Sequence, residues 1–198
     1  NFGVRPMPNL ETKFVAANTL IQIPKQLTLR NRKIEDLEKR LADIRHRHFS
    51  ARTTKTKLKY REEDKETRTQ IGELLKDSGW DTSTATQVSN WNPYDHNSSA
   101  TFFDAEWMFG FQDGFDIIIG NPPYVNMQRS ANSAQLKKLG YKTYEATGDI
   151  YSLFYECGNK LLRRGGVVCY ITSNKWINAS YGKSTRRYFT EQTNPLIL

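Results

Sequence analysis

Two short apolar runs, with a helical pattern between them and another after them, organise the C-terminal half of the chain. Residues 115–120 read FDIIIG and residues 167–172 read VVCYIT, runs that predict strands buried on both faces of a parallel sheet. Between them, apolar residues recur at helical spacing from Tyr151 to Leu162, and a further helix is expected over 181–192. Strand and helix alternate, which is typical of a parallel sheet covered by helices.

The ends of these elements carry their own signals. Asp149 precedes the first helix, where it is placed to cap that helix or to favour its N-terminus. Gly165 and Gly166 are expected to end the helix and turn the chain. Ligands of parallel sheets bind at the carboxyl ends of the strands, and Asn121–Tyr124 and Ser173–Asn174 occupy such ends.

The N-terminal half begins with an apolar stretch and continues with helical patterns. Residues 13–23 predict a short strand and turn, closed by Pro24. Apolar residues spaced three, four and three apart predict a packed helix within 31–49, and a second helix is expected over about 59–77. Two such helices, joined near 50–57, would form an antiparallel hairpin.

Residues 79–113 are rich in Trp, Asn, Ser and Thr and predict a long loop. Its aromatic residues are expected to pin it onto the domain. They are Trp80, Trp91, Phe102, Phe103 and Trp107.

Composition places the chain among globular proteins, with 37% hydrophobic residues over 198 positions. No apolar run approaches the roughly 18 residues of a membrane span, and the N-terminus lacks the plan of a signal peptide. Cys157 and Cys169 are expected to be buried core residues, and His46, His48 and His96 do not predict a zinc site.

The net charge of +8 is unevenly distributed. Residues 25–68 hold 15 Lys and Arg and 8 Asp and Glu, whereas the rest of the chain holds 14 and 13. This segment therefore invites a polyanion, most simply nucleic acid. Two interpretations stay open: a solvated helical insertion, or an arm that lies along DNA phosphates.

The end of the first C-terminal strand offers an unusual set of groups. Asn121 has a side-chain oxygen, Pro122 has a backbone carbonyl, and the prolines Pro122 and Pro123 hold these acceptors in a nearly fixed relation. Tyr124 adds a flat ring beside them. This set suits a planar molecule with an NH₂ group, whose lone pair becomes available once both N–H groups are bound.

The stretch FDIIIGNPPYV at 115–125 resembles motif IV of the S-adenosylmethionine-dependent amino methyltransferases, above all the adenine-specific DNA methyltransferases of restriction-modification systems. Residues 91–110 and 170–189 are similar to the large type II enzymes that join methylation and restriction in one polypeptide. The resemblance implies base flipping in double-stranded DNA, an S-adenosylmethionine cofactor, an associated nuclease, and a place in the cytoplasm of a bacterium or archaeon.

The resemblance also implies roles for individual residues. Asn121 and Pro122 would contact the target amino group, and Tyr124 would stack on the flipped adenine. Pro123 completes the catalytic tetrad and is a second candidate for contact with the cofactor. Asn18 lies in a stretch similar to the motif III strand, where it would contact the cofactor's adenine.

The expected fold is a partial Rossmann-like α/β methyltransferase fold, a mostly parallel sheet with flanking helices and a helical-hairpin insertion. Residues 1–24 would carry motif III, 25–78 the basic hairpin, 79–113 the aromatic loop, and 114–198 motif IV with the following strand–helix units.

The glycine-rich motif I and the acidic motif II residue are not present in these 198 residues. In the family's order both would precede Asn1, and a target-recognition domain would follow Leu198. The chain is thus expected to be a fragment with little activity alone.

Other interpretations remain. Protein-glutamine methyltransferases carry the same tetrad because a glutamine amide is also a flat NH₂ group, and RNA guanine methyltransferases carry related ones. A non-catalytic DNA-binding or assembly module on a methyltransferase fold, or a proline-rich strand exit without chemistry, would also fit.

Overall fold

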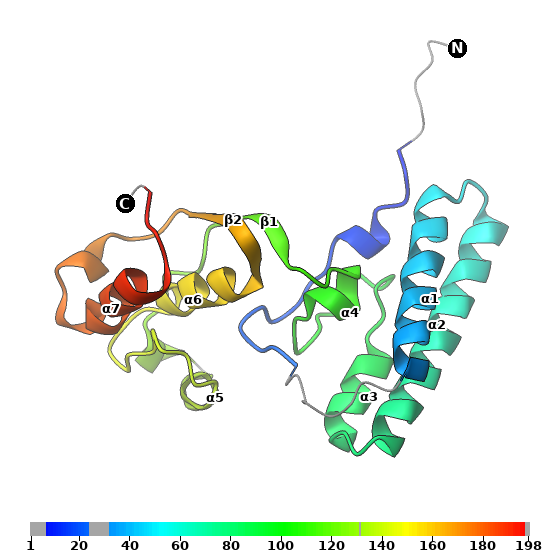
Figure 1. Cartoon of the computed structure of the whole chain (residues 1–198), viewed down its shortest axis with the longest axis horizontal. Coiled ribbons are helices and arrows are strands. Elements are labelled where there is room, and N and C mark those ends of the chain that lie inside the picture. The colour runs from blue at the N-terminus through cyan, green and yellow to red at the C-terminus, as the bar shows by residue number, and fades with distance from the viewer. Residues whose placement is uncertain (1–6, 24–31, 131, 197–198) are drawn as a thin grey trace, which may run out of the picture. The chain divides into compact units, whose positions relative to one another are not determined.

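The computed structural model describes residues 7–23, 32–130 and 132–196. Pro24, which was expected to close the first strand, and residues 25–31 of the basic segment lie outside the described residues. The chain forms two compact units, Asn1–Gln112 and Asp113–Leu198. We call them the N-terminal unit and the C-terminal unit, and we describe each by itself (Figure 1).

The N-terminal unit is built on a helical hairpin. Helix α1, Arg32–Ser50, and helix α2, Thr54–Asp77, lie side by side and are joined by residues 51–53 (Figure 1). Both predicted helices are confirmed, although α2 begins several residues earlier than expected. Thr53 explains the early start, because its side-chain oxygen accepts a hydrogen bond from the Thr56 amide at 3.2 Å and caps the helix.

Aromatic residues of 79–113 pack against the apolar face of this hairpin. The sequence predicted that they would hold the segment onto the domain, but not that the hairpin would be the surface they cover. Trp91, Phe102 and Trp107 are buried in one cluster with Ile34 and Leu41. The other buried members of the cluster are Ile71, Leu75, Ala85, Val88, Ala100 and Met108. Hairpin and aromatic segment thus share one hydrophobic core.

Residues 79–113 are not one long loop. They contain helix α3, Thr82–Asn90, and helix α4, Ala105–Phe109. Each helix begins after an aspartate whose carboxylate accepts a backbone hydrogen bond, Asp81 from Thr84 and Asp104 from Trp107. Apolar periodicity is too short in both segments to reveal them, and the capping residues were the available signal.

The predicted strand over 13–23 does not form. Glu11–Lys13 is a turn of 3₁₀ helix, and the following residues make isolated parallel bridges, Ala17 with Ala100 and Gln22 with Phe103. Between the bridges the Ile21 amide donates to the Asn18 carbonyl at 3.1 Å. This turn interrupts the pairing, so no continuous ladder develops.

A buried carboxylate links the hairpin to the rest of the N-terminal unit. Asp64 is fully buried and accepts from Arg45 Nε at 2.8 Å and from Arg68 Nε at 2.6 Å. The two guanidinium groups also donate to backbone carbonyls, Arg45 to Trp107 at 2.8 Å and Arg68 to Trp91 at 2.5 Å. Two residues from the most basic segment therefore serve the interior.

The C-terminal unit contains a two-stranded parallel sheet. Strand β1, Phe115–Gly120, pairs with strand β2, Leu162–Tyr170, so that Ile117 lies opposite Val167 and Gly120 opposite Tyr170. Helix α6, Tyr151–Leu161, connects the strands, and helix α7, Lys183–Gln192, follows them. The predicted order of strand, helix, parallel strand and helix is confirmed.

Short helices complete the C-terminal unit. Helix α5, Ser133–Lys138, precedes α6, and three turns of 3₁₀ helix span Met127–Arg129, Lys175–Ile177 and Ser180–Gly182. Across the described parts of both units, no helix combines the length and the apolar content that crossing a bilayer requires.

One face of the sheet is exposed, although the sequence predicted that both faces would be buried. Ile117 is 63% exposed and Ile119 is 78% exposed, and Cys169, opposite Ile119, is exposed rather than buried. Alternate side chains of a strand point to opposite faces, so these residues share one face. In the described residues helix α6 covers only the other face, and Cys157 of that helix is buried as expected.

Helix α6 ends earlier than its glycines suggested, and it lies close to β2. The helix ends at Leu161, and Gly165 and Gly166 lie within β2. Gly158, on the apolar face of the helix, faces the Tyr170 hydroxyl, and a Cβ at this position would come within 2.6 Å of that oxygen. A side chain at this position would force the Tyr170 ring to shift, so glycine leaves room for that ring between helix and strand.

The N-terminus of α6 is not capped by the Asp149 carboxylate. The residue before the helix is Ile150, which makes no side-chain cap hydrogen bond. Instead, the backbone carbonyl of Asp149 accepts from both the amide and the hydroxyl of Ser152, at 3.1 and 2.7 Å. Backbone turns replace the expected carboxylate cap.

We expect Asp64→Ala to lower the free energy of unfolding of the N-terminal unit by about 3–5 kcal/mol, because it leaves two buried guanidinium groups without their carboxylate. Asp43, whose carboxylate is exposed and pairs with Arg47, is the matched control. Asp43→Ala should cost less than about 1 kcal/mol. Urea titration, monitored by tryptophan fluorescence, measures the free energy of unfolding of both variants. Equal decreases in the two variants would show that burial of the Asp64 carboxylate is not important.

Candidate active site

Parallel pairing brings the carboxyl ends of β1 and β2 to one edge of the sheet. Beyond β1 lie Asn121–Tyr124, and beyond β2 lie Ile171–Asn174. The Ile171 amide donates to the Gly120 carbonyl at 3.1 Å, so the strands stay paired up to the point where the tetrad begins. The structure therefore brings together the two strand ends that the sequence singled out.

The tetrad combines exposed and buried residues. Pro122 is buried, whereas Asn121 and Pro123 are exposed and Tyr124 is 53% exposed. Because each proline fixes its own φ angle, the backbone between Asn121 and Tyr124 has little freedom. Polar and aromatic groups are thus presented to solvent from a rigid support.

The ring of Tyr124 is held at two points. Its hydroxyl donates to the Ile171 carbonyl at 2.8 Å, and its ring lies edge-on to Tyr151 with centroids 5.9 Å apart. Tyr151 itself is fully buried. The exposed part of the Tyr124 ring is therefore a flat surface with a set orientation, suited to stacking on another planar group.

An aromatic cluster supports this arrangement from within the C-terminal unit. Tyr155 of α6 lies edge-on to Tyr151, to Trp176 and to Phe189 of α7, with centroid distances of 6.2, 5.9 and 4.9 Å. Its hydroxyl forms a hydrogen bond with the hydroxyl of Thr172, just beyond β2. Sequence patterns placed Tyr151 and Tyr155 on one helix face but could not show that four separate segments converge here.

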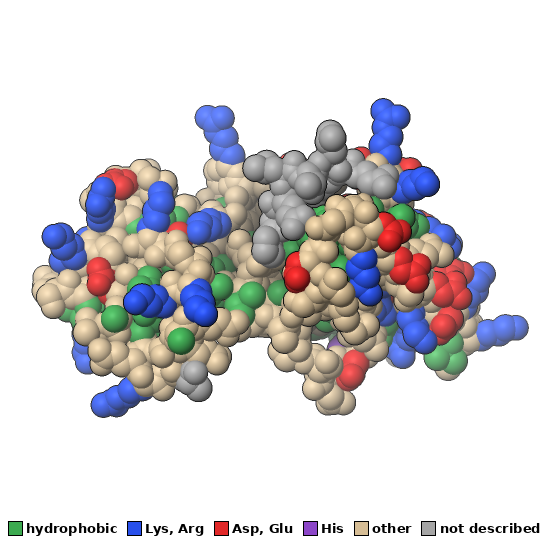
Figure 2. All heavy atoms as spheres, turned by 90° about the horizontal axis from the view of Figure 1, so that it is seen from below, with side chains coloured by type: hydrophobic (Ala, Val, Ile, Leu, Met, Phe, Trp, Pro, Cys, Tyr) green, Lys and Arg blue, Asp and Glu red, His purple; other side chains and the backbone are tan. Residues whose placement is uncertain are grey.

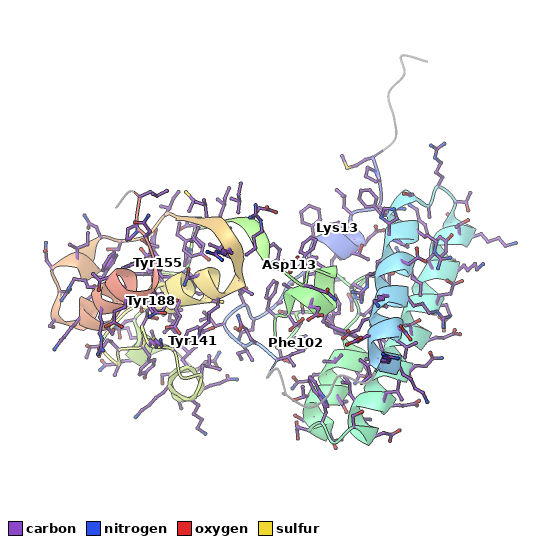
Figure 3. The ribbon with its side chains drawn as sticks, in the orientation of Figure 1. Lys13, Phe102, Asp113, Tyr141, Tyr155 and Tyr188 are labelled. Atoms are coloured by element: carbon purple, nitrogen blue, oxygen red, sulfur yellow. The ribbon has the colours of Figure 1, made fainter. Side chains whose placement is uncertain are left out.

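Figure 3 shows Tyr155 with Tyr188 between helices α6 and α7, where Tyr188 accepts a hydrogen bond from Asn159 Nδ2 at 2.9 Å. Burial raises the pKa of Tyr155, and it raises the pKa of Tyr170 to about 12. Both hydroxyls thus stay protonated at neutral pH. The aromatic cluster that supports the tetrad is therefore uncharged, and it acts through shape and hydrogen bonds rather than through proton transfer.

The chain beyond Tyr124 is fastened by an asparagine. Asn126 accepts from the Gln128 amide and donates to the Thr147 carbonyl, each at 3.0 Å. Backbone bonds from Met127 to the Gly148 carbonyl and from Ile150 to the Val125 carbonyl, each 2.8 Å long, close the same loop. We call these contacts the Asn126 clasp. The bond to Gln128 is local, but the bonds that close the loop join residues more than twenty positions apart, so no sequence pattern could predict them.

Asn18, the predicted cofactor contact, lies in the N-terminal unit, whereas the tetrad lies in the C-terminal unit. The Asn18 amide donates to the Ala100 carbonyl at 2.9 Å, and this bond holds its backbone. Within the described residues its side-chain amide makes no hydrogen bond, and the residue is partly exposed. That side chain is available to a ligand.

Comparison with known proteins is decisive about the family. Residues 16–197 match the Eco57I restriction-modification methylase family. The chain belongs to this family. The matched residues begin in the N-terminal unit and extend past the tetrad.

Several curated relatives match about two fifths of this chain. The type II restriction enzyme and methyltransferase RM.Eco57I of Escherichia coli is 32% identical over 81 residues, 39% of this chain and 8% of that protein. The type II methyltransferase M.XhoI of Xanthomonas vasicola is 32% identical over 79 residues, 39% of this chain and 14% of its own length. The type II methyltransferase M.BanIII of Aneurinibacillus aneurinilyticus is 39% identical over 79 residues, which are 38% of this chain and 13% of that protein. The matched stretch is thus a small part of each of these relatives.

We expect Asn126→Ala to loosen the loop that follows the tetrad, because both hydrogen bonds of the Asn126 side chain are lost. Hydrogen exchange at Gln128 and nearby amides should speed up about tenfold, which corresponds to one or two bonds of about 1 kcal/mol. Asn132, which makes no side-chain cap bond at the start of α5, is the control. If Asn132→Ala accelerates exchange at the same amides equally, the clasp does not hold the loop.

Proposed function

We propose that the protein carrying this chain transfers a methyl group from S-adenosylmethionine to the 6-amino group of adenine in double-stranded DNA. The observation that carries the proposal is the tetrad at the strand edge, whose half-exposed Tyr124 ring is held by the Ile171 carbonyl and by Tyr151. Membership of the Eco57I restriction-modification methylase family supports the choice of DNA.

The chemistry needs two acceptors and no strong base. Asn121 Oδ1 and the Pro122 carbonyl would each accept one N–H of the adenine amino group, which draws the nitrogen lone pair out of conjugation with the ring. As positive charge develops on the nitrogen during transfer, both acceptors stabilise it. The proline-fixed backbone sets these acceptors in advance, so little reorganisation is needed at the moment of reaction.

Tyr124 would receive the target base. An adenine inside a duplex is inaccessible, so it must leave the stack, and an aromatic surface compensates part of the lost stacking. The ring is already oriented by its two contacts, and its exposed face is free to take a base. The uncharged cluster behind it keeps the surroundings apolar.

S-adenosylmethionine would supply an electrophilic methyl group. Of the described residues, Asn18 offers a side-chain amide with unused hydrogen-bonding capacity, which fits the edge of the cofactor's adenine. Pro123 is an exposed apolar member of the tetrad and is a second cofactor contact in the proposal. The name of RM.Eco57I, a restriction enzyme and methyltransferase, motivates the further proposal of an associated nuclease.

We expect Asn121→Ala to reduce methylation by at least about 100-fold, since one preset acceptor for the developing charge is lost. DNA affinity should change little, because the amide contributes mainly in the transition state. Transfer of labelled methyl groups to duplexes, together with fluorescence anisotropy, measures both quantities. Equal labelling of duplexes whose site lacks adenine would overturn the proposal, and labelling of a glutamine-containing peptide instead would favour the protein-glutamine alternative.

Substitutions of Tyr124 separate its ring from its hydroxyl. Tyr124→Phe loses only the bond to the Ile171 carbonyl and should slow methylation about 3- to 10-fold, from roughly 0.5–1.5 kcal/mol. Tyr124→Ala also loses stacking worth about 1–3 kcal/mol and should slow it further. Fluorescence of 2-aminopurine at the target position reports whether the base still stacks outside the duplex. A Phe variant as impaired as the Ala variant would show that the hydroxyl, not the ring, is essential.

A further inference from the structure

The loop after β2 begins beside the tetrad and is rigidly held. Arg186 of α7 directs one guanidinium nitrogen at three backbone carbonyls of this loop, those of Trp176, Ile177 and Ala179, at 2.6, 3.1 and 2.9 Å. Such a contact fixes the path of the backbone, because all three carbonyls converge on one charged donor. We call residues 173–182 the β2 exit loop.

The β2 exit loop is anchored in the interior at Trp176 and at Gly182. Trp176 is buried and stacks at a tilt on Phe189, with centroids 5.1 Å apart. Gly182 lies against the Trp176 carbonyl so closely that a Cβ would come within 1.8 Å of its oxygen. Only glycine fits at that point, and the loop therefore presents its remaining side chains from a fixed frame.

An open cleft of about 530 Å³ lies on the β2 exit loop. It is lined by Asn174, Lys175, Ile177, Asn178, Ala179 and Tyr181. These six residues supply one cation and two amides but no carboxylate. Lys175 is exposed and takes part in no ion pair among the described residues, so its charge faces solvent unneutralised.

The cleft lies within reach of the tetrad. Ile171 accepts the Tyr124 hydroxyl, and Asn174 follows only three residues later, a span of roughly 10 Å at most. At about 3.4 Å of helix axis per nucleotide, one to three nucleotides of one strand cover such a span. A strand whose base occupies Tyr124 would therefore pass its adjoining backbone near Asn174 and Lys175.

Charge is also distributed in a way that favours this unit. The C-terminal unit carries 11 Lys and Arg and 6 Asp and Glu, a surplus of +5, whereas the N-terminal unit carries 18 and 15, a surplus of +3. Figure 2 shows a face of the C-terminal unit on which Lys and Arg side chains outnumber acidic ones. Acids elsewhere in the N-terminal unit offset part of the surplus of segment 25–68, and the smaller C-terminal unit has the larger surplus.

We propose that the cleft on the β2 exit loop binds a backbone phosphate of the DNA strand that carries the target adenine. Lys175 forms the ion pair, and the amides of Asn174 and Asn178 donate to the phosphate oxygens. The ligand is a phosphodiester next to the flipped base, and its role is to set the register of the strand on the tetrad. The inference rests on the proposed function, since it takes the occupant of Tyr124 to be a base of DNA.

The test uses the full-length protein and duplexes that contain its methylation site. Lys175→Ala should weaken binding about 3- to 10-fold near 0.1 M salt and reduce the slope of log K against log salt by about 1. Lys175→Arg should restore the slope, because it keeps the cation. Lys138→Ala, which removes an exposed lysine of α5 outside the cleft, should leave the slope unchanged.

A second measurement locates the contact. Duplexes carry one neutral methylphosphonate at successive positions around the target adenine. The unaltered protein should bind more weakly when the methylphosphonate replaces a phosphate adjoining the adenine. The affinity of Lys175→Ala should be unaffected by the replacement at that position, and at that position alone. Equal slopes for Lys175→Ala and Lys138→Ala, or equal methylphosphonate profiles for Lys175→Ala and the unaltered protein, would overturn the inference. A loss on duplex RNA equal to that on duplex DNA would also overturn it, since it would show non-specific attraction to polyanions.

The outcomes separate the two proposals. If the unaltered protein methylates adenine but Lys175→Ala has the same methylphosphonate profile as the unaltered protein, the proposed function stands and the phosphate contact is wrong. If the methylphosphonate profile shows a Lys175-dependent contact at one phosphate but the unaltered protein transfers no methyl group to adenine, the contact stands and the proposed function is wrong.

Discussion

Parallel pairing of β1 with β2 is the constraint on which the candidate site depends. Strands that run the same way end at the same edge, so one register brings Gly120 opposite Tyr170 and places the tetrad beside Ile171. An antiparallel pair would send the two ends to opposite edges. The connection through α6 makes the parallel arrangement possible, and the close contact of Gly158 with Tyr170 fastens that helix to the sheet.

The chemistry proposed for the tip follows from its neutral surroundings. Buried tyrosines with raised pKa values support Tyr124, and hydrogen bonds such as that from Tyr124 to the Ile171 carbonyl set its orientation. No group in this support has to change its charge during a reaction. The tip is therefore suited to reactions in which acceptors hold an amino group in place, and less suited to those that need a general base.

Local patterns in the sequence predicted β1, α6, β2 and both helices of the hairpin, because each of these elements has a period or a run of its own. The exposure of Ile119 could not be predicted, since it depends on what covers a sheet face. The short helix α4 lacks a readable period, and its signal is the capping residue Asp104. The contact of Tyr124 with Ile171 joins residues 47 positions apart, and only the fold brings them together.

The charge counted along the sequence and the charge exposed on the folded protein indicate different surfaces for contact with DNA. The segment 25–68 is the most basic by count, yet Arg45 and Arg68 are spent on the buried carboxylate of Asp64. A buried, paired guanidinium is not available to release counterions from DNA. Lys175 is one cation, but it is exposed and sits on a loop immobilised by Arg186. Non-specific attraction needs only charge, whereas the proposed placement of one adenine on Tyr124 would need a charge held near that ring. In the proposal Lys175 supplies that charge from a loop whose backbone Arg186 holds, and a surplus counted over the hairpin segment carries no such positional information.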